Sequence, residues 1–408
     1  MVSIRRHQPC QYILHIVQGP TNKVVPMKKI EITQVASPKD LGLFIGFQFK
    51  LYRDDPNWVA PLWFERRAFF NPKKNPFYDH ADVALWLARR DGEVVGTISS
   101  HIDHLHNETH AEKIGMFGFF ESIDDQEVPE ALLSHAKAWV ASRGMRALRG
   151  PLNFSMNHEC GLLLDGTLGP PMVMMTYNPP YYARMFEKFG LKKAMDLYAY
   201  KGFLNQFNRN PSGLPPHLSR IAERARKRTG VTIRTLNIKN FVREIELTKK
   251  VYRDAWVKNW GFVAMTDAEF THLARGLRHL VDPNLALLAE MGGEPIGVCI
   301  ALPDACQWVK HLHGRLLPFG WAKALWYRRR VTDIRLIVAG VIEKYRVRGI
   351  ESLLIFETLK RAIEAGYQGI ETSWILESNE MMNKIILNIG EPWGLHRYRT
   401  YRLYQTDF

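Results

Sequence analysis

Residues 333–365 read DIRLIVAGVIEKYRVRGIESLLIFETLKRAIEA, and this stretch decides the fold that we expect. The β-branched apolar run 334–342 predicts a strand, and the apolar side chains of 353–363 recur at helical spacing. The basic turn 345–349 lies between them. A strand that leads into such a turn exposes the N–H groups of a helix N-terminus, which suit a phosphate. An ordinary strand-to-helix connection with solvated arginines fits this turn equally well.

Length and composition limit the class of protein. With 408 residues, 46% of them hydrophobic, the chain can bury two cores of ordinary size. It has no apolar stretch long enough to span a membrane. The four cysteines form no CxxC pair, which indicates reduced thiols in a cytoplasmic protein. A net charge of +14 favours an anionic partner. We expect residues 1–27 to be a disordered extension, with Met27 as an alternative start.

The sequence repeats itself. Leu51-Tyr52-Arg53-Asp54 recurs as Val251-Tyr252-Arg253-Asp254, a hairpin pattern at 84–96 recurs at 285–297, and an aromatic strand follows both Gly190 and Gly390. The copies lie about 200 positions apart in the same order, which indicates a duplication. Each copy predicts a helix pair, a hairpin, a strand, a long helix, a strand, a helix and a final strand. Proline and glycine break the pattern at 204–217.

This order and the turn 346–351, Arg-Val-Arg-Gly-Ile-Glu, resemble the GNAT N-acyltransferase superfamily, whose acyl-CoA-binding turn reads Arg/Gln-x-x-Gly-x-Gly/Ala. The resemblance implies an α/β fold with mixed sheets in two tandem GNAT-like domains, 28–205 and 206–408. It also implies that the second domain binds acyl-CoA as a co-substrate, with no metal. Glu351 departs from the pattern and puts a carboxylate near the expected pyrophosphate. The expected cofactor-binding residues are Val338, Ala339, Val341, Arg346, Arg348, Gly349, Ile350, Glu351 and Ser352.

The first copy lacks this turn. Its connection, 121–127, is acidic and has no glycine, so we expect no coenzyme A there. The acids suit the N-terminus of the following helix; attraction of an ammonium substrate is the alternative. Many GNAT enzymes carry a tyrosine, after the next strand, that protonates the departing thiolate. Phe186 and Ile386 stand at that position, so the acid lies elsewhere or the thiolate leaves unaided.

Polar residues concentrate at 150–182. The side chains of 153, 155, 157 and 159 alternate, which on an extended chain puts them on one face, opposite Phe154, Met156 and His158. A structural loop that binds its own backbone is the alternative. We expect Glu159 to be the base that accepts the amine proton, with His106 second. The other candidate catalytic residues are Asn153, Ser155, Asn157, Tyr177, Asn178 and Tyr181.

Two further segments have unusual compositions. Residues 101–110 contain four histidines; we expect a solvated turn, with a histidine base next and a metal site third, because no cysteine or spaced carboxylate completes a ligand set. Residues 315–330, within an insertion at 304–332, contain five basic residues, two tryptophans and no acid. That composition is typical of a segment at an anionic membrane surface. A buried helix with snorkelling arginines is the alternative.

The polar segment and the Trp-rich insertion together resemble bacterial two-domain GNAT-like proteins, a group that includes bacterial ceramide synthases. The resemblance implies transfer of a fatty acyl group from acyl-CoA to the amine of a sphingoid base. It implies a cytoplasmic protein, peripheral on the inner membrane, with no DNA or RNA partner. An aminoacyl-tRNA-dependent transferase and a catalytically inactive lipid- or partner-binding module remain as alternatives.

Overall fold

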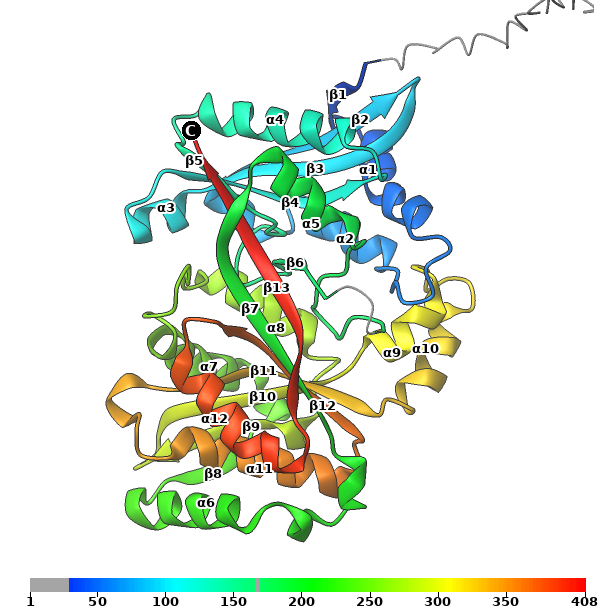
Figure 1. The fold of residues 1–408 in the computed structure, drawn as a ribbon. Helices are drawn as coiled ribbons and strands as arrows, with labels where there is room; N and C mark the ends of the chain where they lie inside the picture. The colour runs from blue at the N-terminus through cyan, green and yellow to red at the C-terminus, as the bar shows by residue number, and fades with distance from the viewer. Residues whose placement is uncertain (1–28, 166–168) are drawn as a thin grey trace, which may run out of the picture.

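The structure, a computed structural model, describes residues 29–165 and 169–408. The predicted extension at 1–27 lies outside the described residues. Two mixed α/β halves are stacked end to end (Figure 1). The first half contains β1 (Glu31–Gln34), α1 (Pro38–Leu51), α2 (Trp63–Phe69), β2 (Ala81–Arg90), β3 (Glu93–Asp103), α3 (His104–His110), β4 (Ile114–Ser122), α4 (Glu127–Ala141), β5 (Ala147–Gly150), β6 (Leu162–Leu163), α5 (Tyr181–Phe189) and β7 (Lys192–Phe203).

The second half repeats this order, as the duplication predicts, with an added helix before it and an insertion after its hairpin. It contains α6 (Pro216–Thr229), β8 (Thr232–Thr235), α7 (Phe241–Ala255), α8 (Asp267–Leu277), β9 (Ala286–Met291), β10 (Glu294–Pro303), α9 (Cys306–Val309), α10 (Gly320–Arg328), β11 (Asp333–Val341), α11 (Ile350–Ala365), β12 (Gly369–Leu376), α12 (Glu380–Gly390) and β13 (His396–Asp407). Among the described residues, no helix is both long enough and apolar enough to cross a membrane.

Local chemistry explains the predicted hairpins. Asp91-Gly92 joins β2 to β3, and Gly292-Gly293 joins β9 to β10. All four residues have positive φ, between 53° and 82°, which a tight turn between twisted antiparallel strands requires. Both hairpins were correctly predicted, because glycines between two apolar segments indicate such a turn in the sequence.

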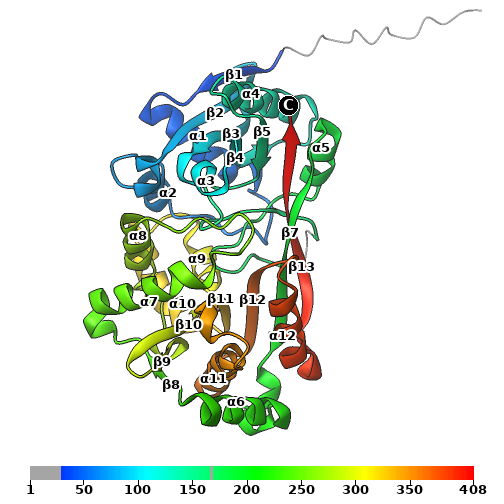
Figure 2. The ribbon, with the colours of Figure 1, turned by 90° about the vertical axis from the view of Figure 1, so that its left-hand side faces the viewer.

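The final strands of the two halves are exchanged. β7 ends the first half but pairs with β12 of the second, from Phe203 opposite Gly369 to Leu197 opposite Leu376. The end of β13 pairs with β5 of the first half, and β7 and β13 pair along most of their length. The described strands therefore form one sheet in the order β1-β2-β3-β4-β5-β13-β7-β12-β11-β10-β9-β8, with β6 beside β13. Figure 2 shows β7 and β13 running from one half into the other. Each half needs the other to cover its sheet edge.

In both halves two parallel strands separate partway along. β4 and β5 pair only at 114–116 with 147–149, and β11 and β12 only at 333–336 with 369–372. In the first half the chain itself fills the gap: Leu152 N donates to Phe117 O at 2.8 Å, and Phe119 N to Asn153 Oδ1 at 2.8 Å. A Cβ on Gly118 would lie 1.8 Å from Leu152 O. In the second half the gap borders a cavity. The two halves therefore differ at the position where the sequence predicts a binding site in the second half alone.

The acidic connection of the first half is fully used within the protein. Glu121 is buried and accepts hydrogen bonds from Gln48, Tyr52 and Tyr182. Burial raises its pKa to about 7 against those hydrogen bonds. The other three carboxylates form ion pairs: Asp125 and Glu127 with Arg90, and Asp124 with Arg184. Glu127 lies in the first turn of α4, as expected for the helix dipole, but the N-cap Gln126 forms no side-chain cap hydrogen bond. The burial of Glu121 was not expected.

Candidate active site

A cavity of about 310 Å³ lies where the two halves meet, beside the gap between β11 and β12. Its walls are mainly apolar and come from α7, α8, the loop 256–265, β11 and β12, with 156–158 and 174 contributed by the first half. Concave, apolar sites with a few polar groups are where proteins bind small ligands. The aromatic lining residues are Phe241, Tyr252, Trp256, Trp260, Phe262, Phe270 and Trp374.

The segment 151–160, which supplies this first-half wall, is a compact loop. Leu152 and Cys160 form an isolated bridge, and His158 N donates to Ser155 O at 3.0 Å. The expectation of an extended chain with four polar side chains on one face is therefore wrong. Asn153 and Ser155 bind neighbouring groups of the loop, which competes with an extended conformation. As a result, the polar side chains point to different places.

Asn157 reaches across to the second half. Its Nδ2 donates to Val263 O at 2.9 Å, and its Oδ1 accepts from Tyr252 OH at 2.7 Å. Both Asn157 and Tyr252 line the cavity. Of the candidate catalytic residues named from the sequence, Asn157 is the one that the structure brings to this wall.

His158 also lines the cavity, and sequence reasoning missed it. Its Nδ1 lies 2.9 Å from Ser155 Oγ, and no described residue forms a hydrogen bond with its Nε2. Burial lowers the pKa of His158 to about 4, and the carboxylates of Glu269, Glu159 and Asp103 oppose that shift. The imidazole is therefore neutral near pH 7 and keeps a lone pair that can accept a proton.

Glu159 is held away from the cavity wall. Both of its oxygens accept from Arg66 Nη2, at 3.0 and 2.8 Å, and Asn153 Nδ2 donates to it at 3.2 Å. Ser155 is buried beside His158. The role of Glu159 as a base stays a prediction, but its lone pairs are already shared with a guanidinium.

Three other candidates face the interior of the first half. Tyr177 OH donates to Asp55 at 2.6 Å, and Tyr181 OH to Ser122 O at 2.8 Å. The amide of Asn178 bonds the main chain of Leu163 in both directions. None of these side chains lines the cavity. Their observed contacts hold the connection between β6 and α5.

Two lining side chains have unsatisfied polar atoms. Within the described ranges, Thr248 Oγ1 and Trp374 Nε1 are buried without a hydrogen-bond partner. Both residues belong to the cavity wall. Buried donors without partners are rare and costly, so they fit a site whose ligand supplies the missing acceptor.

A buried ion pair lies beside the cavity, which is lined by its arginine but not by its glutamate. Arg335 and Glu371 lie opposite each other on the parallel strands β11 and β12, with Nε 3.5 Å from Oε1. Arg335 also donates to Ser373 Oγ at 2.8 Å and to Val173 O at 2.6 Å. Glu371 accepts from Ser373 Oγ and Tyr398 OH. Burial lowers the pKa of Arg335, and the charge of Glu371 opposes that shift.

The predicted turn between β11 and α11 is present, and its binding of a phosphate stays a prediction. Gly349 has φ +82° and is the N-cap of α11, so the helix has no capping side chain at this position. Arg348 is exposed, whereas the Arg346 guanidinium binds the main-chain oxygens of Val341 and Ala255. Glu351 is buried at 7% exposure, so its carboxyl does not stand at the exposed turn. Burial raises its pKa.

The remaining cofactor candidates divide into lining and buried positions. Val338 lines the cavity, Ala339 lies next to it on β11, and Val341 and Ile350 are buried. Ser352 lies in the first turn of α11. The open edge of β11 and the N-terminus of α11 thus lie on either side of one turn. This arrangement fits a donor whose thioester lies along the strand and whose phosphates lie at the turn.

The histidine-rich segment is the end of β3 followed by helix α3, so the expectation of a solvated turn is wrong. Asp103 caps α3 by accepting from His106 N at 3.1 Å, and His106 is buried with its Nε2 3.0 Å from Glu112. His110 Nε2 lies 3.0 Å from Phe262 O in the cavity-lining loop. No group of three or more possible metal ligands gathers in the part of the chain that the structure describes. The segment supports a cavity wall.

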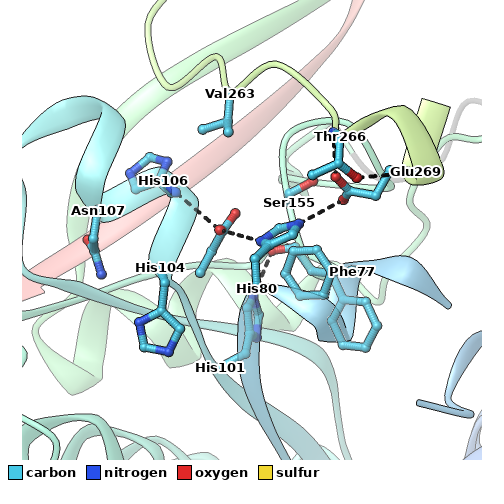
Figure 3. Close-up of polar contacts among 12 residues, drawn as sticks. Phe77, His80, His101, His104, His106, Asn107, Ser155, Val263, Thr266 and Glu269 are labelled. Carbon is cyan, nitrogen blue, oxygen red and sulfur yellow. Dashed lines mark hydrogen bonds and ion pairs between the residues drawn. The ribbon is translucent and has the colours of Figure 1, made fainter. Parts of the chain in front are cut away.

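His80 connects the halves (Figure 3). Its Nδ1 lies 3.0 Å from Asp103 on β3 and its Nε2 lies 3.2 Å from Glu269 on α8. Burial works against the imidazolium, but the hydrogen bonds and charges of both carboxylates outweigh it and raise the pKa of His80 to about 10. The same contacts lower the pKa values of Asp103 and Glu269 against their burial. At neutral pH this is a cation between two anions.

Replacing His80 with glutamine should lower the free energy of unfolding by about 1.5–3 kcal/mol at pH 6, the range for hydrogen bonds to charged groups. The folded pKa of His80 exceeds its unfolded value, so its contribution is complete below about 6.5 and is lost as pH rises toward 10. Denaturant unfolding at pH 6, 8 and 10 measures this. H104Q is the control, because His104 and Asp82 are both 58% exposed. A loss that is equal at all three pH values would contradict a charged His80 between Asp103 and Glu269.

Comparison with known proteins supports both the fold and the family. The chain is 38% identical over 386 residues to the bacterial ceramide synthase of Caulobacter vibrioides, covering 92% of this chain and 97% of that protein. It is 37% identical over 378 residues to protein YghO of Escherichia coli, covering 90% and 92%. No family model matches the chain.

Solved structures agree with the fold. A tandem GNAT protein from the clavulanic acid biosynthesis pathway superposes with a TM-score of 0.56 at 12% identity, covering 93% of this chain and 98% of that one. A GCN5-related N-acetyltransferase from Sphaerobacter thermophilus superposes with a TM-score of 0.50 at 14% identity, covering 93% and 95%. At these identities the likeness concerns the fold alone.

Proposed function

The chain belongs to the family of the bacterial ceramide synthase and protein YghO, and from that premise we propose that it transfers a long-chain fatty acyl group from acyl-CoA to the amine of a sphingoid base. Family and fold make it an N-acyltransferase. The donor, the acceptor and the residues that act on them are the proposal. One observation carries it: the apolar cavity beside the gap between β11 and β12, walled by both halves.

We propose that the acyl donor lies along the open edge of β11. Beyond residue 336 this strand has no pairing with β12, so main-chain groups of 337–341 on that side can bind the donor. An N–H from this segment would polarise the thioester carbonyl and stabilise the negative charge that develops on its oxygen. Thr248 and Trp374 supply further polar contacts from the cavity wall.

The donor phosphates would lie at the N-terminus of α11. The free N–H groups after Gly349 and the exposed charge of Arg348 favour an anion there. Arg346, bound to main-chain oxygens, positions the turn. When bound, coenzyme A supplies the activated thioester and the thiolate leaving group.

We propose His158 as the proton acceptor. The amine nitrogen attacks the thioester carbon, the N–C bond forms, a proton passes from nitrogen to His158 Nε2, and the C–S bond breaks to release the thiolate. A pKa of about 4 makes the free imidazole a weak base. The transfer therefore occurs late, once bond formation has made the N–H acidic. Ser155 at Nδ1 orients the ring.

We also propose a cytoplasmic enzyme that works at the inner surface of a membrane. A sphingoid base resides in a bilayer, and the exposed apolar side chains of 317–326 offer a contact with one.

Thiol release from a panel of acyl-CoAs, short to long, with and without a sphingoid base in detergent micelles, tests the proposal. We expect release that requires both a long acyl chain and the amine. Release with short chains and small amines would retain the acyltransferase but remove the lipid acceptor. No release, together with salt-sensitive tRNA binding, would favour an aminoacyl-tRNA-dependent transferase; no release and no tRNA binding would favour the inactive module.

A further inference from the structure

Residues 315–330, which we call the arm, expose an unusual density of large apolar side chains. α10 has no buried residue, so the alternative of a buried helix is wrong. Figure 1 shows α9 and α10 on the flank of the molecule. Scattered exposed apolar residues are normal, but a contiguous group marks an interaction site. The exposed side chains are Leu317 (77%), Phe319 (74%), Trp326 (61%), Leu325 (60%) and Trp321 (55%).

The charge around these side chains has one sign. Residues 305–332 contain six lysines and arginines and no aspartate or glutamate. Lys323 and Arg329 are exposed, and neither forms an ion pair with a described residue. Arg330 lies over the Trp326 ring at 4.6 Å. Tryptophan beside basic residues on an exposed short helix is typical of a segment at a membrane interface.

A second cavity, of about 400 Å³, lies between the arm and the central strands. Lys201, Lys310 and Arg330 line it, and none of the three forms an ion pair within the described part of the chain. Arg399 is buried there, with its Nη2 bonded to the oxygens of Gly169 and Pro170. These four cationic side chains, none of them ion-paired with a described carboxylate, make this cavity suited to an anion.

Two acids also line the second cavity and do not cancel this charge. Asp304 Oδ1 accepts from Val173 N at 2.9 Å and Cys306 N at 3.1 Å, and burial raises its pKa to about 7. Asp333 accepts from Thr332 Oγ1 at 3.2 Å. Even with both acids ionised, Lys201, Lys310, Arg330 and Arg399 leave the wall positive.

We propose that the arm docks on an anionic phospholipid bilayer and that the second cavity takes the phosphate of one lipid headgroup. The apolar side chains enter the interface, while Lys310 and Arg330 approach the headgroups from the cavity rim. The absence of acids at 305–332 disfavours a protein partner, whose surface would present charges of both signs. The docking deepens the proposed function by naming the surface from which a lipid amine arrives.

Strand β11 contributes lining residues to both cavities. Asp333 lines the second cavity, and Arg335 lines the first. Alternate residues of a strand share a face, so the docking site and the candidate active site lie along the same face of β11. A lipid held at the arm would therefore lie on the side of the sheet where transfer is proposed.

Flotation with vesicles of phosphatidylcholine alone or with phosphatidylglycerol tests the docking without any substrate. We expect the full chain to bind the anionic vesicles and to release them at high salt. K310Q with R330Q should weaken binding by about fivefold per charge, and W321A with W326A by about tenfold. The matched controls are R224Q with K227Q, exposed charges on α6, and V242A, at 73% exposure on α7; both should bind as the parent does.

Other outcomes would overturn the proposal. Equal binding by parent and arm variants removes the docking surface. If K310Q with R330Q lowers binding of inorganic phosphate in titration calorimetry but leaves vesicle binding unchanged, the cavity serves a free phosphate and not a lipid. If those variants weaken RNA binding alone, the partner is a nucleic acid. The biological purpose of the docking rests on the proposed function, but its test does not. Vesicle binding without turnover would refute the proposed chemistry alone. Turnover in micelles without vesicle binding would refute the docking alone.

Discussion

Replacing His158 with alanine should lower kcat by about 10²–10⁴-fold, the usual contribution of a positioned base, while the KM for acyl-CoA changes little. The physical reason is that the neutral imidazole is the titratable group at the cavity wall with a ring nitrogen free of described partners. Without it, the proton on the attacking nitrogen must pass to water inside a mainly apolar site. Steady-state kinetics with a long-chain acyl-CoA and a micellar amine measures the effect.

Chemical rescue distinguishes a base from a structural residue. H158A leaves a space in which free imidazole can accept the proton, so added imidazole should restore part of kcat. The matched variant E159A should show no rescue, because it removes the partner of Arg66. If E159A instead loses more activity than H158A, the base predicted from the sequence is the correct one. An H158A enzyme with parental kcat would exclude His158.

The pH dependence gives an independent check. His158 titrates at about 4, so its lone pair is lost only as pH falls through that value. The parent should therefore keep the His158-dependent part of its kcat down to about pH 5. In H158A, no fall in kcat at low pH should come from protonation of this residue. A limb near the ordinary histidine value of about 6.5 that persists in H158A would mean that another group accepts the proton.

The sequence predicted the two-fold repeat because turn chemistry and periodicity act locally. The tight turns at Asp91-Gly92 and Gly292-Gly293 require positive φ, and aspartate and glycine adopt it at low cost whatever the rest of the chain does. The exchange of β7 and β13 was not predictable in this way. An apolar, aromatic strand carries the same pattern whichever neighbour it pairs with, and the choice is made by the whole sheet.

The candidate site was predicted less well than the fold, for a physical reason. The alternation at 153–159 indicated a strand, but Asn153 and Ser155 bond the nearby main chain and side chains and bend it into a loop. That change brings His158, assigned to the opposite face, to the cavity. The pair Arg335–Glu371 did leave a signal: each of two apolar strands contains one of two opposite charges, and the structure places these strands side by side.

Removing the carboxylate of that pair should produce the largest loss of stability. Arg335 is 3% exposed and Glu371 is 1% exposed. In E371A the guanidinium would keep neutral partners, Ser373 and Val173, but no counter-charge. Leaving one buried charge uncompensated costs about 3–5 kcal/mol. Urea unfolding should show this as a lower midpoint with an unchanged m-value.

A double-mutant cycle isolates the pair from the cost of truncation. R335M removes the charge that E371A leaves behind, so the double variant R335M/E371A should recover much of the loss, and the coupling free energy should reach about 2–3 kcal/mol. E371Q tests the charge alone, because it retains an acceptor for Ser373 and Tyr398. Strictly additive losses would mean that the two side chains act separately. Because Arg335 also lines the cavity, a folded R335M with an altered KM for the donor would extend its role from stability to substrate binding.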